Sequence, residues 1–227
     1  MNSVCQTPKI SFKRFRKAFF CALTLALALF STTPSAQADP AADARASLKG
    51  TIDQVLQLIK DPAFSNPASR ENQIEAIDSK IREVFDFSEF SSRTVGKNWK
   101  NFTDTQKTQF IDAFAQLLRA TYIDKIESYN GEEVKYLGET VGTKGDKVEV
   151  ATSIALKTQE APIKVSYRML EKGRWVVYDV VIEGVSLVQN YRTQFNELLQ
   201  KGDAEALIAK VNSRAQELRE QNKTAGN

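Results

Sequence analysis

The sequence predicts an α+β fold in which helices precede and follow a curled, four-stranded antiparallel sheet. Apolar residues recur at intervals of three and four as far as about residue 130, which is the spacing of amphipathic helices. Between residues 134 and 182 they alternate with polar residues instead, and after residue 185 the helical spacing returns. Residues 39–227 contain neither a repeat nor a low-complexity linker, so we expect a single domain there.

The N-terminal half is expected to be helical. Apolar spacing predicts helices over 43–59 and 69–85, separated by Asp61-Pro62, which ends the first one. A short helix is expected at 87–90, followed by a turn before Trp99. These elements come before any strand, so the helices should form one layer and the sheet another.

A long helix should begin at a capping box. Thr103 and Gln106 have the spacing at which each side chain accepts a hydrogen bond from the other residue's backbone amide. The stripe that follows is rich in aromatic residues and extends to Tyr129, and Asn130-Gly131 is expected to end the helix. One side of this helix is therefore strongly apolar.

Four strands are expected, joined by linkers of hairpin length. Alternating segments cover 134–136, 147–156 and 163–169, and the fourth strand, 175–182, is apolar on both faces. The linkers at 144–146, 159–162 and 172–174 contain Gly, Pro or Asp, which favour tight turns. The result is an antiparallel meander with one polar and one apolar face.

The C-terminal helices should cover the apolar face of this sheet. Helical stripes are expected from Val185 to Leu199 and, after the capping residue Asp203, as far as Leu218. From Arg219 onward the chain is polar, so we expect a loosely ordered tail.

Four residues near the start of the first of these helices have expected roles. Gly184 should permit the turn from strand to helix, and Glu183 should cap the entering helix. Asp179 and Arg192 could pair with each other or cap helix ends, and Arg192 could instead contact a lipid head group.

The first 38 residues have the features of a Sec-type secretory signal peptide. Five basic residues without any Asp or Glu precede the apolar run Ala18–Phe30, which is shorter than the roughly 20 residues of a membrane span. The small residues Ala36-Gln37-Ala38 provide a cleavage site. Phe20 precedes Cys21 where a bacterial lipoprotein would have a small residue. We expect export without a lipid anchor and cleavage after Ala38; an uncleaved anchor is the alternative.

Cleavage would change the charge and the chemistry of the chain. The whole sequence has 31 basic and 28 acidic residues; without the five basic residues of the leader, 26 remain against 28, a net charge of −2. Nucleic-acid binding depends on clustered cations, so this charge does not support a nucleic-acid partner. Both cysteines lie in the leader and the chain has no histidine.

The absence of His and Cys from residues 39–227 excludes several kinds of site. A zinc site built on those ligands, a cysteine nucleophile and a Ser-His-Asp triad are all impossible. Carboxylate pairs such as Asp86/Glu89 and Asp179/Glu183 could act as acid and base, but such spacings are common among structural residues. We therefore predict no catalytic residue, no metal site, no cofactor and no enzymatic activity.

The large apolar residues could form a packed core or line a ligand cavity. Aromatic residues at helical spacing are usually core residues. Tyr hydroxyls, however, need hydrogen-bond partners when they are buried, and several Tyr residues belong to this apolar set. The sequence leaves both interpretations open.

Two segments resemble the MlaC family, also called the toluene-tolerance auxiliary transport proteins. Residues Tyr178–Phe195 (YDVVIEGVSLVQNYRTQF) resemble the signature of that family. The upstream stretch Arg93–Trp99 is similar to its helical half, as are Gln106, Phe110, Phe114, Leu118, Tyr122 and Tyr129. The likeness extends over nearly all of residues 45–212.

The resemblance implies a role in lipid transport. Members of the family are periplasmic phospholipid carriers of Gram-negative bacteria that maintain outer-membrane lipid asymmetry, and their fold is a nuclear-transport-factor-like α+β cone with an apolar cavity. The implied partners are phospholipid, an outer-membrane lipoprotein–porin complex and an inner-membrane ABC transporter with a substrate-binding periplasmic ring. We expect a monomer with phospholipid as cargo. The expected lipid-binding residues are Phe90, Trp99, Phe114, Leu118, Tyr122, Val150, Ile154, Val165, Tyr167, Val180, Val185 and Tyr191.

Two other functions are compatible with the residues alone. An exported hydrolase that acts on lipids could use carboxylates or Tyr in place of His and Cys. A non-catalytic interaction module would have a dry core and no cargo. Lipid that is recovered with the protein, intact and in stoichiometric amounts, would argue against both.

Overall fold

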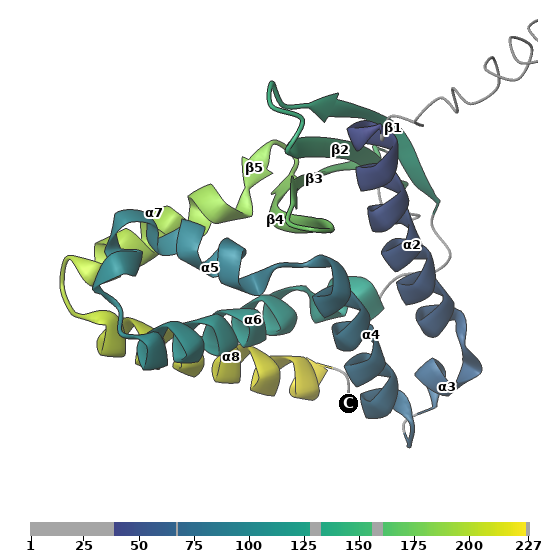
Figure 1. Cartoon of the computed structure of the whole chain (residues 1–227). Coiled ribbons are helices and arrows are strands. Elements are labelled where there is room, and N and C mark those ends of the chain that lie inside the picture. The colour runs from purple at the N-terminus through teal and green to yellow at the C-terminus, as the bar shows by residue number, and fades with distance from the viewer. Residues whose placement is uncertain (1–38, 67, 128–132, 156–160, 226–227) are drawn as a thin grey trace, which may run out of the picture. The chain divides into compact units, whose positions relative to one another are not determined.

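The computed structural model describes residues 39–66, 68–127, 133–155 and 161–225 (Figure 1). The predicted leader, Tyr129 with Asn130-Gly131, and Leu156 lie outside the described residues. From Asp39 onward the chain forms one compact unit.

The helices that precede the sheet agree with the predicted order. They are α2 (Pro40–Lys60), α3 (Pro62–Ser65), α4 (Arg70–Val84), α5 (Phe87–Val95), the 3₁₀ helix η1 (Gly96–Asn101) and α6 (Asp104–Glu127). Helix α2 begins earlier than the apolar spacing indicates, because Asp39 accepts a hydrogen bond from the Ala41 amide (3.0 Å) and Pro40 takes the first helical position.

The predicted capping box at the start of α6 is confirmed. The Gln106 amide donates to Thr103 Oγ1 (3.2 Å), and the Thr103 amide donates to Gln106 Oε1 (3.0 Å). Both side chains therefore satisfy backbone amides that have no partner inside the helix.

The sheet is an antiparallel meander with strand order β1-β2-β3-β4-β5. Its strands are β1 (Val134–Val141), β2 (Lys147–Ile154), β3 (Ile163–Glu171), β4 (Trp175–Ile182) and β5 (Val185–Ser186). The four predicted strands are present, and β5 is a short fifth one. Register shifts at Tyr136/Gly138 and at Arg168/Met169 mark two β-bulges, which increase the local twist of a sheet.

The fifth strand exists because the chain turns back after β4. Glu183 (φ 48°) and Gly184 (φ 80°) both have positive φ angles, which is the conformation of the central residues of a type I′ hairpin turn. The sequence predicted a direct passage from strand to helix at this point. The structure instead places Val185 and Ser186 beside Ile182 and Val181 before the helix starts.

The chain ends in two helices, α7 (Leu187–Leu199) and α8 (Ala204–Ala225). Asp203 caps α8 as predicted, accepting a hydrogen bond from the Ala206 amide (2.9 Å). The last helix continues beyond the position at which the sequence suggests fraying, because Arg219 and Asn222 donate hydrogen bonds to Gln116 Oε1 (2.6 Å) and the Ala120 carbonyl (2.9 Å) of α6.

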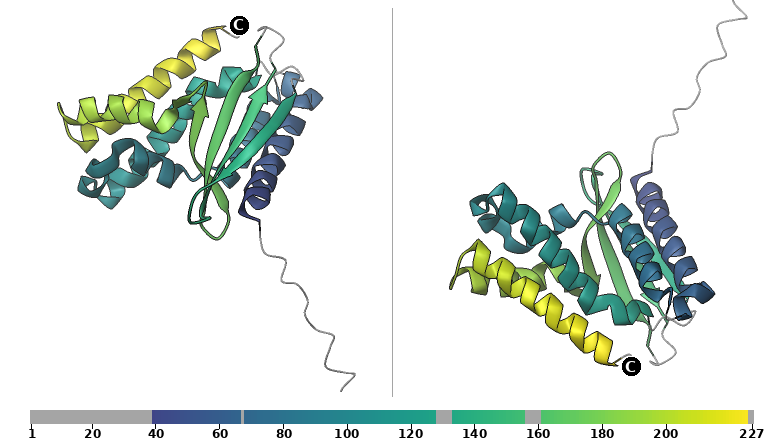
Figure 2. Two further views of the ribbon diagram at one scale, coloured as in Figure 1. Left: turned by 90° about the horizontal axis from the view of Figure 1, so that it is seen from above. Right: turned by 90° about the horizontal axis from the view of Figure 1, so that it is seen from below.

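The helices cover one face of the sheet, and the left view of Figure 2 looks onto the other face. One large core joins the covered face to helices α2, α5, α6, α7 and α8. A smaller core, centred on Phe64, Ile74 and Ile77, joins α3 and α4 to the outer side of α2 and to Ile123 of α6. Among the described residues, no helix is long and apolar enough to cross a membrane.

Candidate functional site

The strand register places the predicted sheet residues on one face. Val150 is opposite Tyr167, and Tyr167 is opposite Val180. Because side chains alternate along a strand, the remaining members of this face follow from the same register. We call this the apolar sheet face: Tyr136, Val148, Val150, Ile154, Ile163, Val165, Tyr167, Met169, Val177, Val180 and Ile182.

Burial varies along the apolar sheet face. Val148, Met169 and Val177, which lie in one cross-strand row, are at most 2% exposed and belong to the same core as Ala44 and Leu48 of α2. Further along the strands, five side chains of this face are only partly buried: Tyr136, Ile154, Ile163, Tyr167 and Ile182. The face is therefore closely covered at one end and more accessible at the other.

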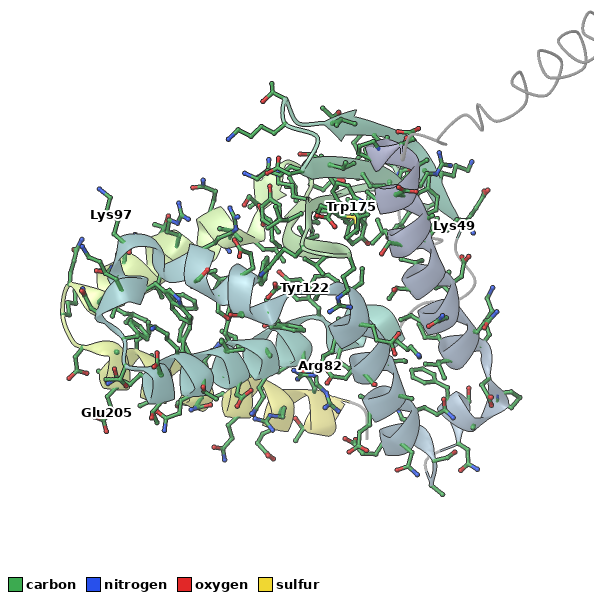
Figure 3. All side chains as sticks on the ribbon, in the orientation of Figure 1. Lys49, Arg82, Lys97, Tyr122, Trp175 and Glu205 are labelled. Carbon is green, nitrogen blue, oxygen red and sulfur yellow. The ribbon has the colours of Figure 1, made fainter. Side chains whose placement is uncertain are left out.

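Helix α6 contributes a stripe of residues one turn apart. Phe114 is completely buried, Leu118 is 9% exposed and Tyr122 is partly buried. Figure 3 shows Tyr122 in the region between α6 and the sheet. Burial, and to a smaller extent Tyr191, raises the pKa of Tyr122 to about 12. Accessible surface thus increases along this stripe toward the C-terminal end of α6.

Four of the predicted residues lie in an aromatic cluster between the helices. Phe90 stacks on Phe114 with 5.6 Å between ring centroids, and Tyr191 meets Phe114 edge-on at 4.9 Å. Trp99 packs edge-on against Phe110 at 6.3 Å. These side chains pack against other aromatic side chains, so the cluster extends the hydrophobic core from the sheet into the space between the helices.

Val185 is separated from the other predicted residues. The helical stripe inferred from the sequence would turn Val185 inward, but the residue belongs to β5 and is 57% exposed. The reason is the hairpin turn before it, which the sequence analysis did not predict.

The apolar sheet face contains a cluster of polar groups that extends from its β1 edge to the central strand β3. We call it the Tyr136 cluster: Arg45, Tyr136, Glu139 and Tyr167. The Arg45 guanidinium lies 5.1 Å from the ring centroid of Tyr136, and its Nη1 is 3.3 Å from Glu139 Oε1. The bulge at Tyr136/Gly138 allows Glu139 to pair with Val150 and to lie on the covered side. Arg45 gave no signal in the sequence, because it lies on a polar stretch of its helix.

The two tyrosines of this cluster are strongly desolvated. Burial raises the pKa of Tyr167 to about 12. The pKa of Tyr136 is also raised to about 12, first by burial and then by Asp53 and Tyr167, while Arg45 acts in the opposite direction. Deprotonation of either hydroxyl would place a charge where water stabilises it poorly.

Neither hydroxyl has a hydrogen-bond partner among the residues that the structure describes. Tyr136 Oη is buried and unpaired. Tyr167 forms no hydrogen bond within the described ranges, although its side chain is not fully covered. Buried hydroxyls normally find partners. Among the described residues, Ser91 Oγ of α5 is another buried hydroxyl without one, but Tyr136 and Tyr167 are the two that lie on the apolar sheet face.

The family follows from comparison with known proteins. A sequence model of the MlaC protein family matches residues 49–213, which is well over half of the chain. The chain belongs to the MlaC family. The resemblance inferred from the two motif segments is thereby confirmed.

Two known proteins are similar to this chain over most of its length. The intermembrane phospholipid transport system binding protein MlaC of Haemophilus influenzae is 22% identical over 211 residues, covering 88% of this chain and 94% of the relative. The solved structure of a phospholipid-binding protein from Ralstonia solanacearum, in complex with a phospholipid, has a TM-score of 0.70 and 27% sequence identity. The match covers 78% of this chain and 99% of the other.

The segment Tyr178–Phe195, on which the resemblance to the MlaC family rests, forms the junction between β4, β5 and α7. Asp179 is 3% exposed, and its carboxylate accepts hydrogen bonds from Ser186 Oγ (2.7 Å), the Val188 amide (3.0 Å) and Arg168 Nη1 (3.0 Å). Ser186 Oγ in turn accepts from the Gln189 amide (3.1 Å). Asp179 and Ser186 together cap α7.

The role expected for Glu183 needs correction, whereas helix capping, one of the roles left open for Arg192, is confirmed. The Glu183 carboxylate accepts a hydrogen bond from the Lys164 amide and does not cap α7. Arg192 Nε and Nη2 donate to the Arg93 carbonyl at the end of α5 (2.7 and 2.5 Å). Arg192 therefore caps the C-terminus of another helix, and it does not pair with Asp179.

The structure offers no candidate for a metal centre in the part of the chain that it describes. No group of three or more Asp, Glu, His or Cys side chains there could hold a metal ion. The sheet provides an apolar face on which, within the described residues, Tyr136 and Tyr167 have unpaired hydroxyls, with the Arg45–Glu139 ion pair beside them.

Proposed function

We propose that this chain is the periplasmic phospholipid shuttle of an intermembrane lipid transport system that maintains outer-membrane lipid asymmetry. One observation carries the proposal. The apolar sheet face keeps accessible surface at Tyr136, Ile154 and Tyr167, and burial raises the pKa of Tyr167 to about 12. A side chain that is remote from bulk water and still partly uncovered is suited to line a site for an apolar ligand.

The physical requirement for such a carrier is burial of acyl chains. Each buried CH₂ group is worth about 0.8 kcal/mol, so one chain of about 16 carbons corresponds to roughly 12 kcal/mol of transfer free energy. A protein that carries this lipid through water must replace nearly all of that contact. Valine and isoleucine on three neighbouring strands, opposite Leu118 and Tyr122 of α6, supply such a surface.

The predicted lipid-binding residues have different parts in this proposal. Tail contacts are assigned to Leu118, Tyr122, Ile154, Val165, Tyr167 and Val180. Val150 is completely buried and supports these residues from within the sheet. Phe90, Trp99, Phe114 and Tyr191 support the site from behind through their aromatic contacts. Val185 lies outside the site because its side chain is directed to solvent.

The remaining parts of the proposal concern export, partners and chemistry. The leader 1–38 directs export, and the shuttle exchanges phospholipid with an outer-membrane lipoprotein–porin complex and an inner-membrane ABC transporter. The Haemophilus relative is named for such a transport system, which supports these partners. Transport by burial needs no nucleophile, metal or cofactor, so we assign no enzymatic activity.

Native mass spectrometry of the protein purified from a Gram-negative periplasm tests the proposal. We expect intact phospholipid in stoichiometric amounts. Ile154→Trp, which fills the apolar sheet face, should reduce bound lipid at least ten-fold while the circular dichroism spectrum is retained. Lys164→Trp adds the same side chain to the exposed face of the neighbouring strand and should leave bound lipid unchanged.

Two results would overturn the proposal. Protein that is consistently free of lipid, and that takes up none from phospholipid vesicles, would favour an interaction module. Fatty acid or lysophospholipid in place of intact lipid would indicate a hydrolase.

A further inference from the structure

The polarity of the side chains in the Tyr136 cluster decreases from the β1 edge of the apolar sheet face toward the central strand β3. The Arg45 side chain is 45% exposed, and that of Glu139 is 16% exposed. Tyr136 is partly buried with its hydroxyl covered, and Tyr167 lies on the central strand of the same face. From solvent inward, the cluster therefore presents the Arg45–Glu139 ion pair, two hydroxyl donors and then aliphatic side chains.

This order of groups matches the order of groups along a phospholipid. The phosphodiester carries a charge and accepts hydrogen bonds, the ester carbonyls accept hydrogen bonds without a charge, and the acyl chains do neither. An unpaired hydroxyl in a desolvated site costs free energy until an acceptor reaches it. The two unpaired tyrosine hydroxyls are donors, and ester carbonyls are acceptors that would enter together with the tails.

We propose that the Tyr136 cluster fixes the orientation of the bound lipid, with the ester carbonyls on the hydroxyls of Tyr136 and Tyr167 and the phosphodiester on Arg45. This inference rests on the proposed function, because it assumes that phospholipid is the cargo. Tyr136 Oη becomes reachable when the lipid displaces the side chains that cover it. The acyl chains then extend from Tyr167 along Val165 and Ile154 toward Tyr122.

The charges near the cluster favour a head group without excess charge. Glu139 faces Arg45, and on the same helix Lys49 pairs with Asp53 (2.6 Å). These four groups have no net charge, so an anionic head group gains little attraction from the cluster as a whole. A zwitterionic head group such as phosphoethanolamine can place its phosphate on Arg45 and its ammonium beside a carboxylate.

Lipid exchange with vesicles that contain two competing lipids tests the hydroxyl contacts. The vesicles contain equal amounts of dipalmitoyl phosphatidylethanolamine and its diether analogue, which lacks the ester carbonyls, and native mass spectrometry measures the ester-to-ether ratio bound to the full-length mature protein. In Tyr136→Phe/Tyr167→Phe we expect this ratio to fall about ten-fold relative to the wild type, because the donors that favour the ester are gone. Tyr178→Phe, at a tyrosine covered by Arg93 outside the cluster, should retain the wild-type ratio.

A second pair of lipids tests the contact to Arg45. Vesicles with equal amounts of dipalmitoyl phosphatidylethanolamine and dipalmitoylglycerol differ only in the phosphate head group. Arg45→Gln should lower the bound ratio of phospholipid to diacylglycerol about ten-fold, because charge-assisted hydrogen bonds are the stronger ones. Free inorganic phosphate should leave the ratio unchanged, since the phosphate in question belongs to the lipid.

Arg82→Gln is a matched control for Arg45→Gln. Arg82 is equally exposed (45%), pairs with a carboxylate on its own helix (Asp78, 2.7 Å) and lies 5.2 Å from the ring centroid of Phe87. It has a comparable environment but lies outside the Tyr136 cluster, so its variant should bind like the wild type. Equal effects of the two substitutions would overturn the role of Arg45.

The outcomes separate this inference from the proposed function. If the wild type takes up lipid and the double tyrosine variant keeps the wild-type ester-to-ether ratio, the orientation is wrong while the carrier function stands. If the wild type takes up no lipid at all, both are wrong. The melting temperature of the lipid-free Tyr136→Phe protein should equal or exceed that of the wild type, because the substitution removes an unpaired hydroxyl.

Discussion

Two regions of the molecule differ in whether their buried polar groups have hydrogen-bond partners. At the junction of β4, β5 and α7, the buried Asp179 carboxylate has three hydrogen-bond donors. At the apolar sheet face, the hydroxyls of Tyr136 and Tyr167 have no hydrogen-bond partner in the described part of the chain. A buried network in which every polar group is hydrogen-bonded holds secondary-structure elements in place. Buried donors without partners can be satisfied by a ligand that brings acceptors. The contrast separates the part of the chain that maintains the fold from the part to which we assign cargo binding.

The largest expected effect is on the junction. Asp179→Ala removes the acceptor for Ser186, the Val188 amide and Arg168, so it should lower the free energy of unfolding by about 3–5 kcal/mol. Urea unfolding measures this loss. Asp78→Ala, which breaks the pair with Arg82 on the surface of α4, should cost about 0.5 kcal/mol. Similar losses in the two variants would contradict the role of Asp179.

A moderate effect is expected at the hairpin turn of the junction. Gly184 has φ 80°, and a Cβ atom added there would meet no other atom within 4 Å, so the cost of Gly184→Ala is backbone strain alone. We expect a loss of about 1 kcal/mol in thermal unfolding. Gly50→Ala, inside α2 and equally free of neighbours, should have the opposite sign and stabilise by about 0.5–1 kcal/mol.

The last effect concerns Tyr122 of α6 and the two tyrosines of the apolar sheet face; it is absent at neutral pH and appears only at alkaline pH. The pKa values of Tyr122, Tyr136 and Tyr167 are raised from 10.0 to about 12. The folded protein therefore holds these protons more tightly than the unfolded chain. The resulting stability is fully present below pH 10 and is lost as the pH rises from 10 to about 12.

Two measurements check this prediction. The free energy of unfolding should be constant from pH 7 to 9 and should fall above pH 10, and the ultraviolet absorbance of tyrosinate should rise in the folded protein only at higher pH than in the unfolded chain. Titration of these tyrosines near pH 10 in the folded state would show that the sheet face is open to water. Bound phospholipid should delay the titration further.

The sequence predicted most local structure, and its error at the junction of β4, β5 and α7 has one cause. The helices, the capping box at Thr103 and the four long strands follow from spacing that is visible within one segment. The hairpin at Glu183–Gly184 was missed because Glu183 adopts a positive φ angle that residues other than Gly rarely have. That single turn moved Val185 from an expected inward position to solvent.

The site shows the same division between local and long-range information. The alternation of residues in two strands predicted Val150, Ile154, Val165 and Tyr167 as one set, and the register places them on one face together with Val180. No spacing relates Arg45 to Tyr136, since they are 91 residues apart in the sequence and meet only because α2 packs on the sheet. Contacts of this kind depend on tertiary packing.

Three properties could be determined from the sequence by itself: the absence of sites built on His or Cys in residues 39–227, the order of the long helices and strands, and the membership in the MlaC family. Those properties depend on residue types and on short-range periodicity. Only the tertiary structure decided which polar groups are satisfied and which are left without partners, because hydrogen bonding depends on distances between elements. Asp179 and Tyr167 both appear in the sequence as residues of strands, and their different roles follow from what packs against them.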